Sequence, residues 1–139
     1  MTRRNGFTLV ELVVVILILG ILAGVAAPKM FNTSGTAVDN GLKQTLAIVR
    51  DAIELYAAQN GGALPPCTSP GLDFRNALQP YIRGAFPKCP VGTKDNGVTA
   101  DGTASASPPT GWNFNTSTGA FTCAYNGLSN DKATLYSDF

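Results

Sequence analysis

Hydrophobic residues are concentrated at the start of the chain. The stretch Phe7–Ala27 follows a short polar leader and is almost wholly apolar, with Glu11 as its only charged residue. A helix of this length spans about 30 Å, the thickness of the hydrocarbon core of a bilayer. The pattern therefore predicts a membrane-spanning helix.

A second, different pattern begins near Gly35 and runs to about Gln59. Apolar residues recur there at steps of three and four, which places them on one helix face. The stripe consists of Val38, Leu42, Leu46, Val49, Ile53 and Tyr56, and Ile48, Ala52 and Leu55 widen it. Asn60-Gly61-Gly62 is a helix stop. We therefore expect one long helix whose amphipathic half packs against a globular domain.

The pattern in the remaining residues predicts a small domain that contains both helix and strand. Leu72–Leu78 is a short helix candidate, and Lys94–Gly111 is expected to be an exposed loop with a short strand at Val98–Thr99. The segments 111–115 and 120–125 alternate aromatic and polar residues around a turn with Gly119, which predicts a hairpin. Its aromatic residues, expected to pack the sheet, are Trp112, Phe114, Phe121 and Tyr125. The expected fold class is α+β, a long N-terminal helix on a small antiparallel sheet.

The charges near the first helix indicate its orientation. Arg3 and Arg4 precede the apolar segment, and only Lys29 follows it closely. The positive-inside bias predicts a single-pass protein with a cytoplasmic N-terminus and with the residues after Pro28 on the far side of the membrane. Glu11 is costly inside this segment, at roughly 2.5–3.5 kcal/mol for a mid-membrane carboxylate. A plain membrane anchor leaves that carboxylate unexplained.

A cleaved secretory signal peptide explains the segment poorly. Val25-Ala26-Ala27 is similar to a small-x-small cleavage site, but Pro28 would follow the cut. The apolar run is also long for a signal peptide, and Glu11 is out of place in it. A different processing event accounts better for the residues around Glu11.

Gly6-Phe7-Thr8-Leu9-Val10-Glu11-Leu12 resembles the processing motif of type IV pilins and type II secretion pseudopilins. The resemblance implies cleavage between Gly6 and Phe7 by a prepilin peptidase and N-methylation of Phe7. It implies assembly roles for Thr8 and Glu11, with the Glu11 carboxylate pairing with the new amine of a neighbouring subunit. The alternative is that Glu11 lies at the membrane interface, stabilised by the helix dipole.

The same resemblance extends to residues that weaken the helix. Gly20 and Gly24 lower helix propensity, and Pro28 removes a backbone donor. Small residues four apart also let membrane helices approach closely. These three residues are similar to the family segment that melts on assembly and gives the filament flexibility. A simple kink, or the exit from the membrane, is the alternative.

Composition narrows the function classes further. Removing Arg3 and Arg4 with the leader leaves eight basic side chains against nine acidic ones, so no nucleic-acid partner is expected. The chain has no His and no recognisable constellation of catalytic groups, so we do not expect an enzyme. No cofactor is expected. Major pseudopilins commonly carry calcium in a C-terminal acidic loop. Here Asn126, Asn130, Asp131 and Asp138 are too sparse to predict that metal site.

Three cysteines lie in the domain expected outside the membrane. The spacing of Cys67, Cys89 and Cys123, without His, argues against zinc. Two of them could form a disulfide in an oxidising compartment. Cys89–Cys123 is slightly favoured because it would tie a Pro-flanked loop to the best predicted strand, and Cys67–Cys89 is nearly as good.

These patterns predict four regions: a leader at 1–6, a transmembrane and polymerisation half-helix at 7–29, an amphipathic half-helix at 30–60, and a globular α/β region at 61–139. The expected function is a structural subunit of a type IV pilus-like or type II secretion pseudopilus filament. Its expected partners are further copies of itself, prepilin peptidase, an inner-membrane assembly platform and minor pilins or pseudopilins. The alternative is a membrane-anchored extracytoplasmic binding module that does not polymerise.

Overall fold

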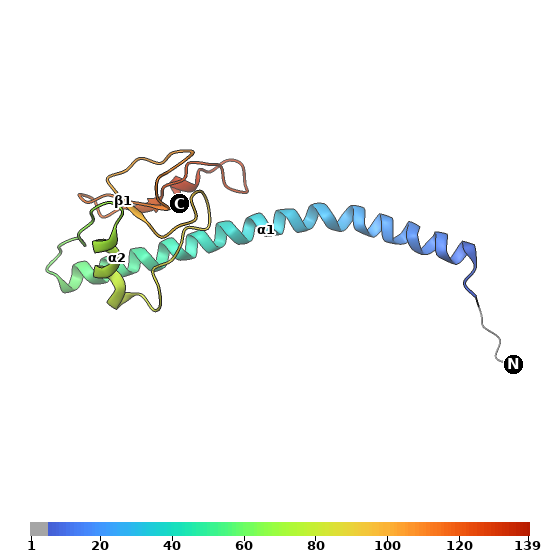
Figure 1. Ribbon diagram of the computed structural model, residues 1–139, viewed down its shortest axis with the longest axis horizontal. Helices are drawn as coiled ribbons and strands as arrows, with labels where there is room; N and C mark the ends of the chain where they lie inside the picture. The colour runs from blue at the N-terminus through green and yellow to red at the C-terminus, as the bar shows by residue number, and fades with distance from the viewer. Residues whose placement is uncertain (1–5) are drawn as a thin grey trace. The chain divides into compact units, whose positions relative to one another are not determined.

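The structure is a computed structural model that describes residues 6–139, except for the side chains of residues 28–32. The leader arginines, Arg3 and Arg4, lie outside the described residues. Contacts divide the chain into two units, Met1–Gly35 and Thr36–Phe139. Helix α1, Leu9–Gln59, runs through both units and continues past Pro28 without a break in its helical backbone (Figure 1).

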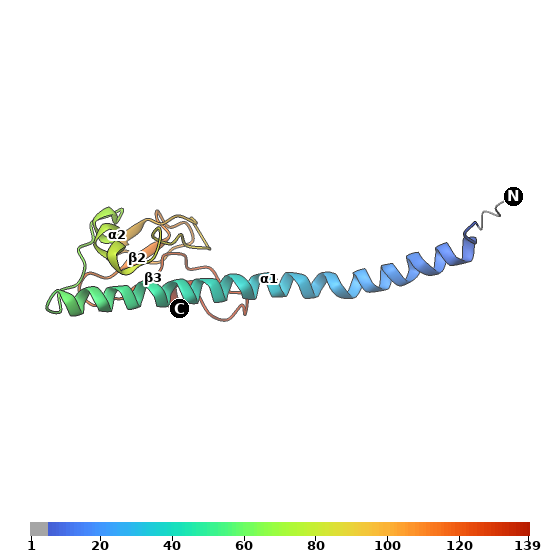
Figure 2. The same cartoon turned by 90° about the horizontal axis from the view of Figure 1, so that it is seen from below.

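The second unit contains the remaining elements. They are α2 (Leu72–Leu78), the 3-10 helix η1 (Gln79–Tyr81), the strands β1 (Val98–Ala100), β2 (Trp112–Phe114) and β3 (Phe121–Cys123), and the 3-10 helix η2 (Tyr136–Asp138). Helix α2 and the strands lie along the C-terminal part of α1 (Figure 2). The α+β prediction is thereby confirmed, as are the short helix and the hairpin.

The sheet differs from the prediction in one respect. Within residues 6–139 its strand order is β1-β2-β3, with β2 antiparallel to β3 but parallel to β1. The expectation of a wholly antiparallel sheet was therefore wrong. Residues 101–111 return the chain to the end of the sheet at which β1 began. Strand β2 therefore starts there and runs parallel to β1.

The core of the second unit contains residues of α1, α2, the three strands and η2. Helix α1 contributes Leu42, Leu46 and Val49, each at most 1% exposed. Phe74 of α2 lies among the aromatic rings of the sheet, with its centroid 4.5 Å from that of Phe114 and 5.9 Å from that of Phe121. Trp112, Phe114 and Phe121 are buried as predicted, and Tyr125 is half-buried.

Two predictions about exposure were wrong. Ile48 and Leu55 do not join the buried stripe of α1, and more than half of each side chain is exposed. At about 100° per residue, both lie roughly 110–130° from the centre of that stripe. The segment Lys94–Gly111 is not simply exposed either, because Val98, Pro108 and Thr110 in it are buried. Pairing of β1 with the central strand β2 draws this loop onto the core.

Candidate assembly site and C-terminal anchors

The start of helix α1 is closed by three reciprocal hydrogen bonds between Thr8 and Glu11. The Thr8 backbone N–H and hydroxyl each donate to Glu11 Oε2 at 2.8 Å, and the Glu11 N–H donates to Thr8 Oγ1 at 3.2 Å. This is a capping box, in which two otherwise unpaired N–H groups are satisfied by side chains. The Glu11 carboxylate therefore has partners within its own chain.

The sequence prediction named Thr8 and Glu11 as assembly residues but did not foresee this cap. The signal was available, because Thr followed three residues later by Glu before an apolar run is the capping-box pattern. The cap also defines where the helix begins, since Leu9 is its first residue.

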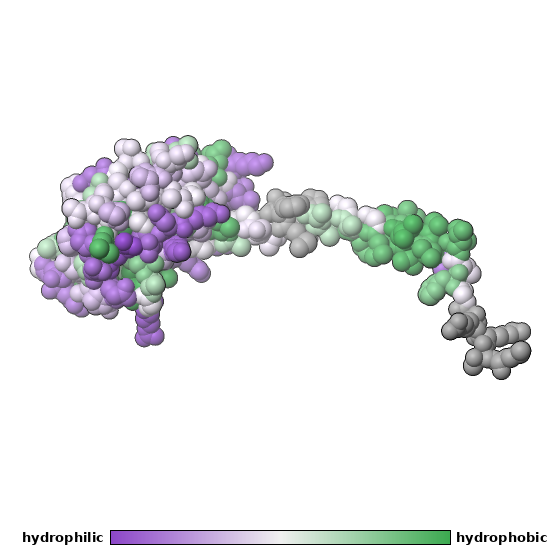
Figure 3. Space-filling view, in the orientation of Figure 1, coloured by the Kyte–Doolittle hydropathy of each residue, from purple (hydrophilic) through white to green (hydrophobic). Residues whose placement is uncertain are grey.

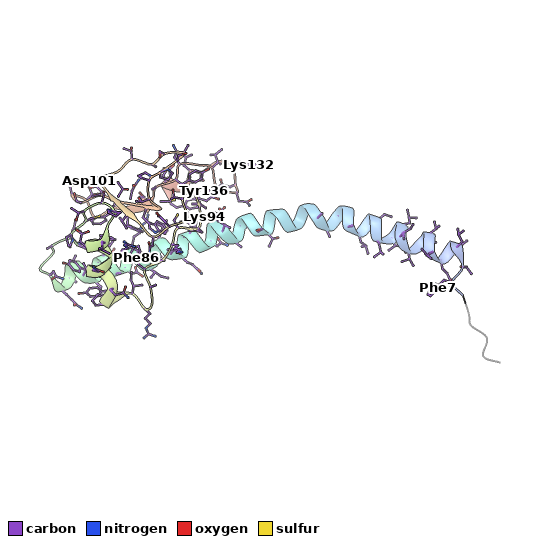
Figure 4. The ribbon with its side chains drawn as sticks, viewed as in Figure 1. Phe7, Phe86, Lys94, Asp101, Lys132 and Tyr136 are labelled. Atoms are coloured by element: carbon purple, nitrogen blue, oxygen red, sulfur yellow. The ribbon has the colours of Figure 1, made fainter. Side chains whose placement is uncertain are left out.

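The residues on either side of the predicted cleavage bond are accessible. A side chain built at Gly6 would have no neighbour within 4 Å. Phe7 is 85% exposed, and its side chain is labelled at the start of α1 in Figure 4. No other described side chain shields the Gly6–Phe7 bond at Gly6.

The segment Leu9–Ala27 forms a continuous apolar surface. It has the length and composition of a membrane span, and none of it is buried within the chain. Its large side chains are between 46% and 79% exposed, and they form the green region of α1 in Figure 3. A Cβ added at Gly20 or Gly24 would meet no atom within 4 Å. The described contacts therefore give these two glycines no packing role.

In the second unit, two polar residues of α1 anchor the C-terminal segment. Asp39 is buried and accepts hydrogen bonds from the Tyr136 hydroxyl at 2.9 Å and the Asn130 N–H at 3.0 Å. Arg50 donates to the carbonyl oxygen of Phe121 at 2.9 Å and to that of Phe139. Sequence reasoning missed both anchors. Their only signal was a charged residue beside an apolar stripe, which usually marks a solvated edge.

The turn that precedes η2 is organised around Asp131. Its carboxylate accepts hydrogen bonds from Ser129, from the N–H groups of Ala133 and Thr134, and from the Thr134 hydroxyl. These bonds favour the ionised form and hold the pKa of Asp131 well below its usual range. The nearby Tyr136 has its pKa raised to about 12, first by burial and then by its bond to Asp39.

The cysteines are placed unequally. Cys89 and Cys123 are buried with their sulfur atoms 3.5 Å apart, while Cys67 is half-buried in the segment before α2. All three are free thiols in the structure. The predicted disulfide is therefore not confirmed, although the favoured pair is brought into contact.

Comparison with known proteins identifies the N-terminal segment. Residues 1–27 match the family described as "Prokaryotic N-terminal methylation motif". The chain is 38% identical over 65 residues to the type IV narrow pilus major component PilA5 of Thermus thermophilus, covering 47% of this chain and 55% of the relative. It is 35% identical over 71 residues to the type II secretion system core protein G of Aeromonas hydrophila, covering 51% and 48%.

A longer match reaches into the globular region. The core protein G of Pectobacterium carotovorum is 31% identical over 103 residues, or 66% of this chain and 64% of the relative. The chain spans about half the length of the curated relatives it matches first. No solved structure matches the chain. These relatives are named as pilus and secretion-system components, in agreement with the prediction that the chain is not an enzyme. The methylation motif and these relatives support the resemblance of the chain to type IV pilins and type II secretion pseudopilins.

Proposed function

We propose that the chain is a structural subunit of a type IV pilus-like or type II secretion pseudopilus filament. Prepilin peptidase cuts it between Gly6 and Phe7, and it polymerises through the N-terminal part of α1. The observation that carries this proposal is the apolar segment Leu9–Ala27, which is unburied within the chain and follows the processing motif directly. Similarity to a pilus component and to secretion-system core proteins supports it.

The apolar segment must be shielded from water both before assembly and in the filament. Lipid covers it before assembly, since its length matches the hydrocarbon core. In a filament, the same segments of neighbouring subunits take the place of lipid. The open space at Gly20 and Gly24 suits this second setting, because small residues let helices approach closely without clashing.

Glu11 sets the register between subunits. Cleavage creates an amine on Phe7, adjacent to the capping residue Thr8. The carboxylate already accepts the hydrogen bonds of its own cap, and each of its oxygens can accept more than one. It can therefore take the amine of a neighbour as a charged partner while Thr8 keeps it oriented. Burying the carboxylate without such a partner would be far more costly.

The remaining parts of the proposal concern location and partners. The N-terminus lies in the cytoplasm and residues beyond the membrane segment lie in the periplasm, where an inner-membrane platform adds subunits to the filament. Minor pilins or pseudopilins join the same filament. Melting of the helix between Gly20 and Pro28 gives the filament its flexibility, and the side chain of Pro28 lies outside the described residues.

The test is to recover filaments and read the N-terminus of their subunits. The full chain is expressed in a host with a working pilus or pseudopilus machinery, and surface filaments are sheared off and purified. Mass spectrometry is expected to find a chain that begins at N-methylated Phe7. Gly6→Val is expected to leave an uncut, membrane-inserted chain, because the added side chain obstructs the peptidase at the scissile bond.

A matched control separates processing from insertion. Gly35→Val changes a glycine of α1 that lies outside the motif, and this variant should be cut normally. A mature chain beginning at Pro28 would contradict the proposal and indicate a cleaved signal peptide. A chain that is cut at Phe7 but stays in the membrane fraction, with active machinery present, would instead favour the anchored binding module.

A further inference from the structure

Cys89 and Cys123 meet in the interior of the second unit. Their sulfur atoms are 3.5 Å apart, and the exposed fractions of the two residues are 1% and 0%. Cys123 is the last residue of β3, and Cys89 lies in the loop that follows Pro87. Disulfide-bonded sulfurs are about 2.0 Å apart, so the two atoms need to approach by only about 1.5 Å.

The loop that carries Cys89 is closed by a backbone hydrogen bond and packs closely against Gly111. The Cys89 N–H donates to the carbonyl oxygen of Asp95 at 2.8 Å and closes the loop. A Cβ at Gly111 would lie 2.7 Å from the Cys89 Cβ and 2.5 Å from the Asp95 oxygen. Cys89 therefore comes this close only because residue 111 has no side chain. The contact between the two sulfurs follows from how the loop is packed.

Cys67 is a poor competitor for either partner. It is half-buried in a different segment, and burial together with the carboxylates of Asp73 and Asp101 raises the pKa of its thiol to about 11. At neutral pH little of it is thiolate, and thiolate is the attacking species in disulfide exchange. The two cysteines already in contact are favoured as a pair by their position.

We propose that Cys89 and Cys123 form an intrachain disulfide that closes while the domain folds, fastening the Cys89–Asp95 loop to β3 and leaving Cys67 as a thiol. The inference rests on the proposed function, because that function places the domain in an oxidising compartment. Both thiols lose a proton and together give two electrons to a disulfide-bearing oxidant, which is reduced to a dithiol. Because both sulfurs are buried, the oxidant reaches them only before the core around Trp112 has closed.

The first experiment maps the thiols of the full chain. Protein from detergent-solubilised membranes is denatured and alkylated, then reduced and alkylated with a second, heavier reagent. Mass spectrometry is expected to find the first label on Cys67 alone and the second on Cys89 and Cys123. A first label on all three cysteines would overturn the proposal, as would a linked peptide containing Cys67.

Cysteine variants measure how much the disulfide stabilises the domain. Cys67→Ser should leave the linked pair and the melting temperature of the domain unchanged. Cys89→Ser should free Cys123 and lower the melting temperature by roughly 10 °C or more, as should reduction of the unmutated chain. If reduction leaves the melting temperature of the unmutated chain unchanged, the bond does not fasten the loop and the proposal fails.

The order of events is tested by refolding. The reduced chain is offered oxidised glutathione either in denaturant or after it has refolded in detergent. Closure in the refolded chain is expected to be at least tenfold slower, and equal rates would contradict closure during folding. Filament formation is scored separately from sheared material. A linked pair in a chain that never enters filaments would support the disulfide while contradicting the proposed function.

Discussion

The two parts of helix α1 share one secondary structure but differ in what covers them. In Leu9–Ala27 the large apolar side chains point all round the helix, and each is at least 46% exposed. In the part that belongs to the second unit, the apolar residues form one stripe, and Leu42, Leu46 and Val49 are buried. A helix that is apolar all round needs lipid or other helices, whereas a striped helix needs only one partner.

The difference shows where each part obtains its stability. The striped part is completed within the chain, by α2 and the sheet. The apolar part is not covered by other described residues, and under the proposed function lipid and then neighbouring subunits cover it, with Glu11 setting the register between them. Substitutions in the two parts should therefore have separable consequences, on folding for one and on assembly for the other.

The largest expected effect is on assembly, from Glu11→Gln. The amide keeps the size of the side chain but removes the charge that is proposed to pair with a neighbour's amine, and loss of a buried pair costs roughly 3–5 kcal/mol. Filament yield from sheared cells should fall at least about tenfold, while insertion improves slightly. Glu54→Gln, an exposed position on the striped part, is the control and should assemble normally. Glu11→Gln filaments at unchanged yield and helical rise would show that the carboxylate does not set the register.

The next effect concerns folding of the striped part. Leu46→Ala removes a side chain that is 1% exposed and should lower the free energy of unfolding by roughly 2–5 kcal/mol. Ile48→Ala, two residues away and 54% exposed, should change it by no more than about 0.5 kcal/mol. Thermal unfolding of the detergent-solubilised chain measures both. Similar losses for the two variants would mean that Ile48 is covered by something within the chain.

A smaller effect is expected at the anchor between α1 and the C-terminal segment. Tyr136→Phe keeps the ring but leaves a buried Asp39 oxygen without its hydroxyl donor, at a cost of about 1–3 kcal/mol. Tyr125→Phe is the matched control, since its ring stacks on Tyr136 at a centroid distance of 6.1 Å and is retained. Hydrogen exchange of the Asn130 and Tyr136 amides should accelerate only in Tyr136→Phe. Equal acceleration in both variants would indicate that stacking, rather than the hydroxyl, holds the segment.

The same anchor makes stability depend on alkaline pH. An unfolded tyrosine titrates near pH 10, whereas burial and Asp39 raise the pKa of Tyr136 to about 12. The unfolded state therefore loses its proton first, so the contribution of Tyr136 is complete below about pH 10 and is lost as pH rises toward 12. Melting temperature should fall less steeply over that window in Tyr136→Phe. If the melting temperature falls equally steeply with pH in both chains, groups other than Tyr136 cause the loss of stability at alkaline pH.

The smallest effect is expected in acid, at the exposed Asp131 turn. Its pKa is lowered by the hydrogen bonds it accepts, so its contribution is complete above about pH 4, where an unfolded Asp is ionised, and falls as pH decreases. Asp131→Asn should reduce the acid dependence of melting below that pH. An unchanged acid profile would indicate that these bonds are replaced by water without loss.

The sequence by itself determined the elements whose signals are local. An unbroken apolar run is enough to specify a membrane-length helix, a three-and-four spacing is enough to specify the buried stripe, and aromatic residues around Gly119 specify the hairpin. The motif Gly6–Glu11 was equally readable, because its chemistry lies within a few consecutive residues. The Thr8–Glu11 cap was readable on the same grounds.

Only the tertiary structure decided what depends on residues far apart in the chain. The parallel pairing of β1 with β2, the burial of Val98 and the exposure of Ile48 and Leu55 all follow from which surface meets the sheet. The roles of Asp39 and Arg50 as anchors could not be read from the sequence, because their partners lie 71 to 97 positions away along the chain. Cys89 meets Cys123 because Gly111 leaves room for it. Spacing along a chain carries no information about such encounters, since packing of the whole core decides which side chains come together.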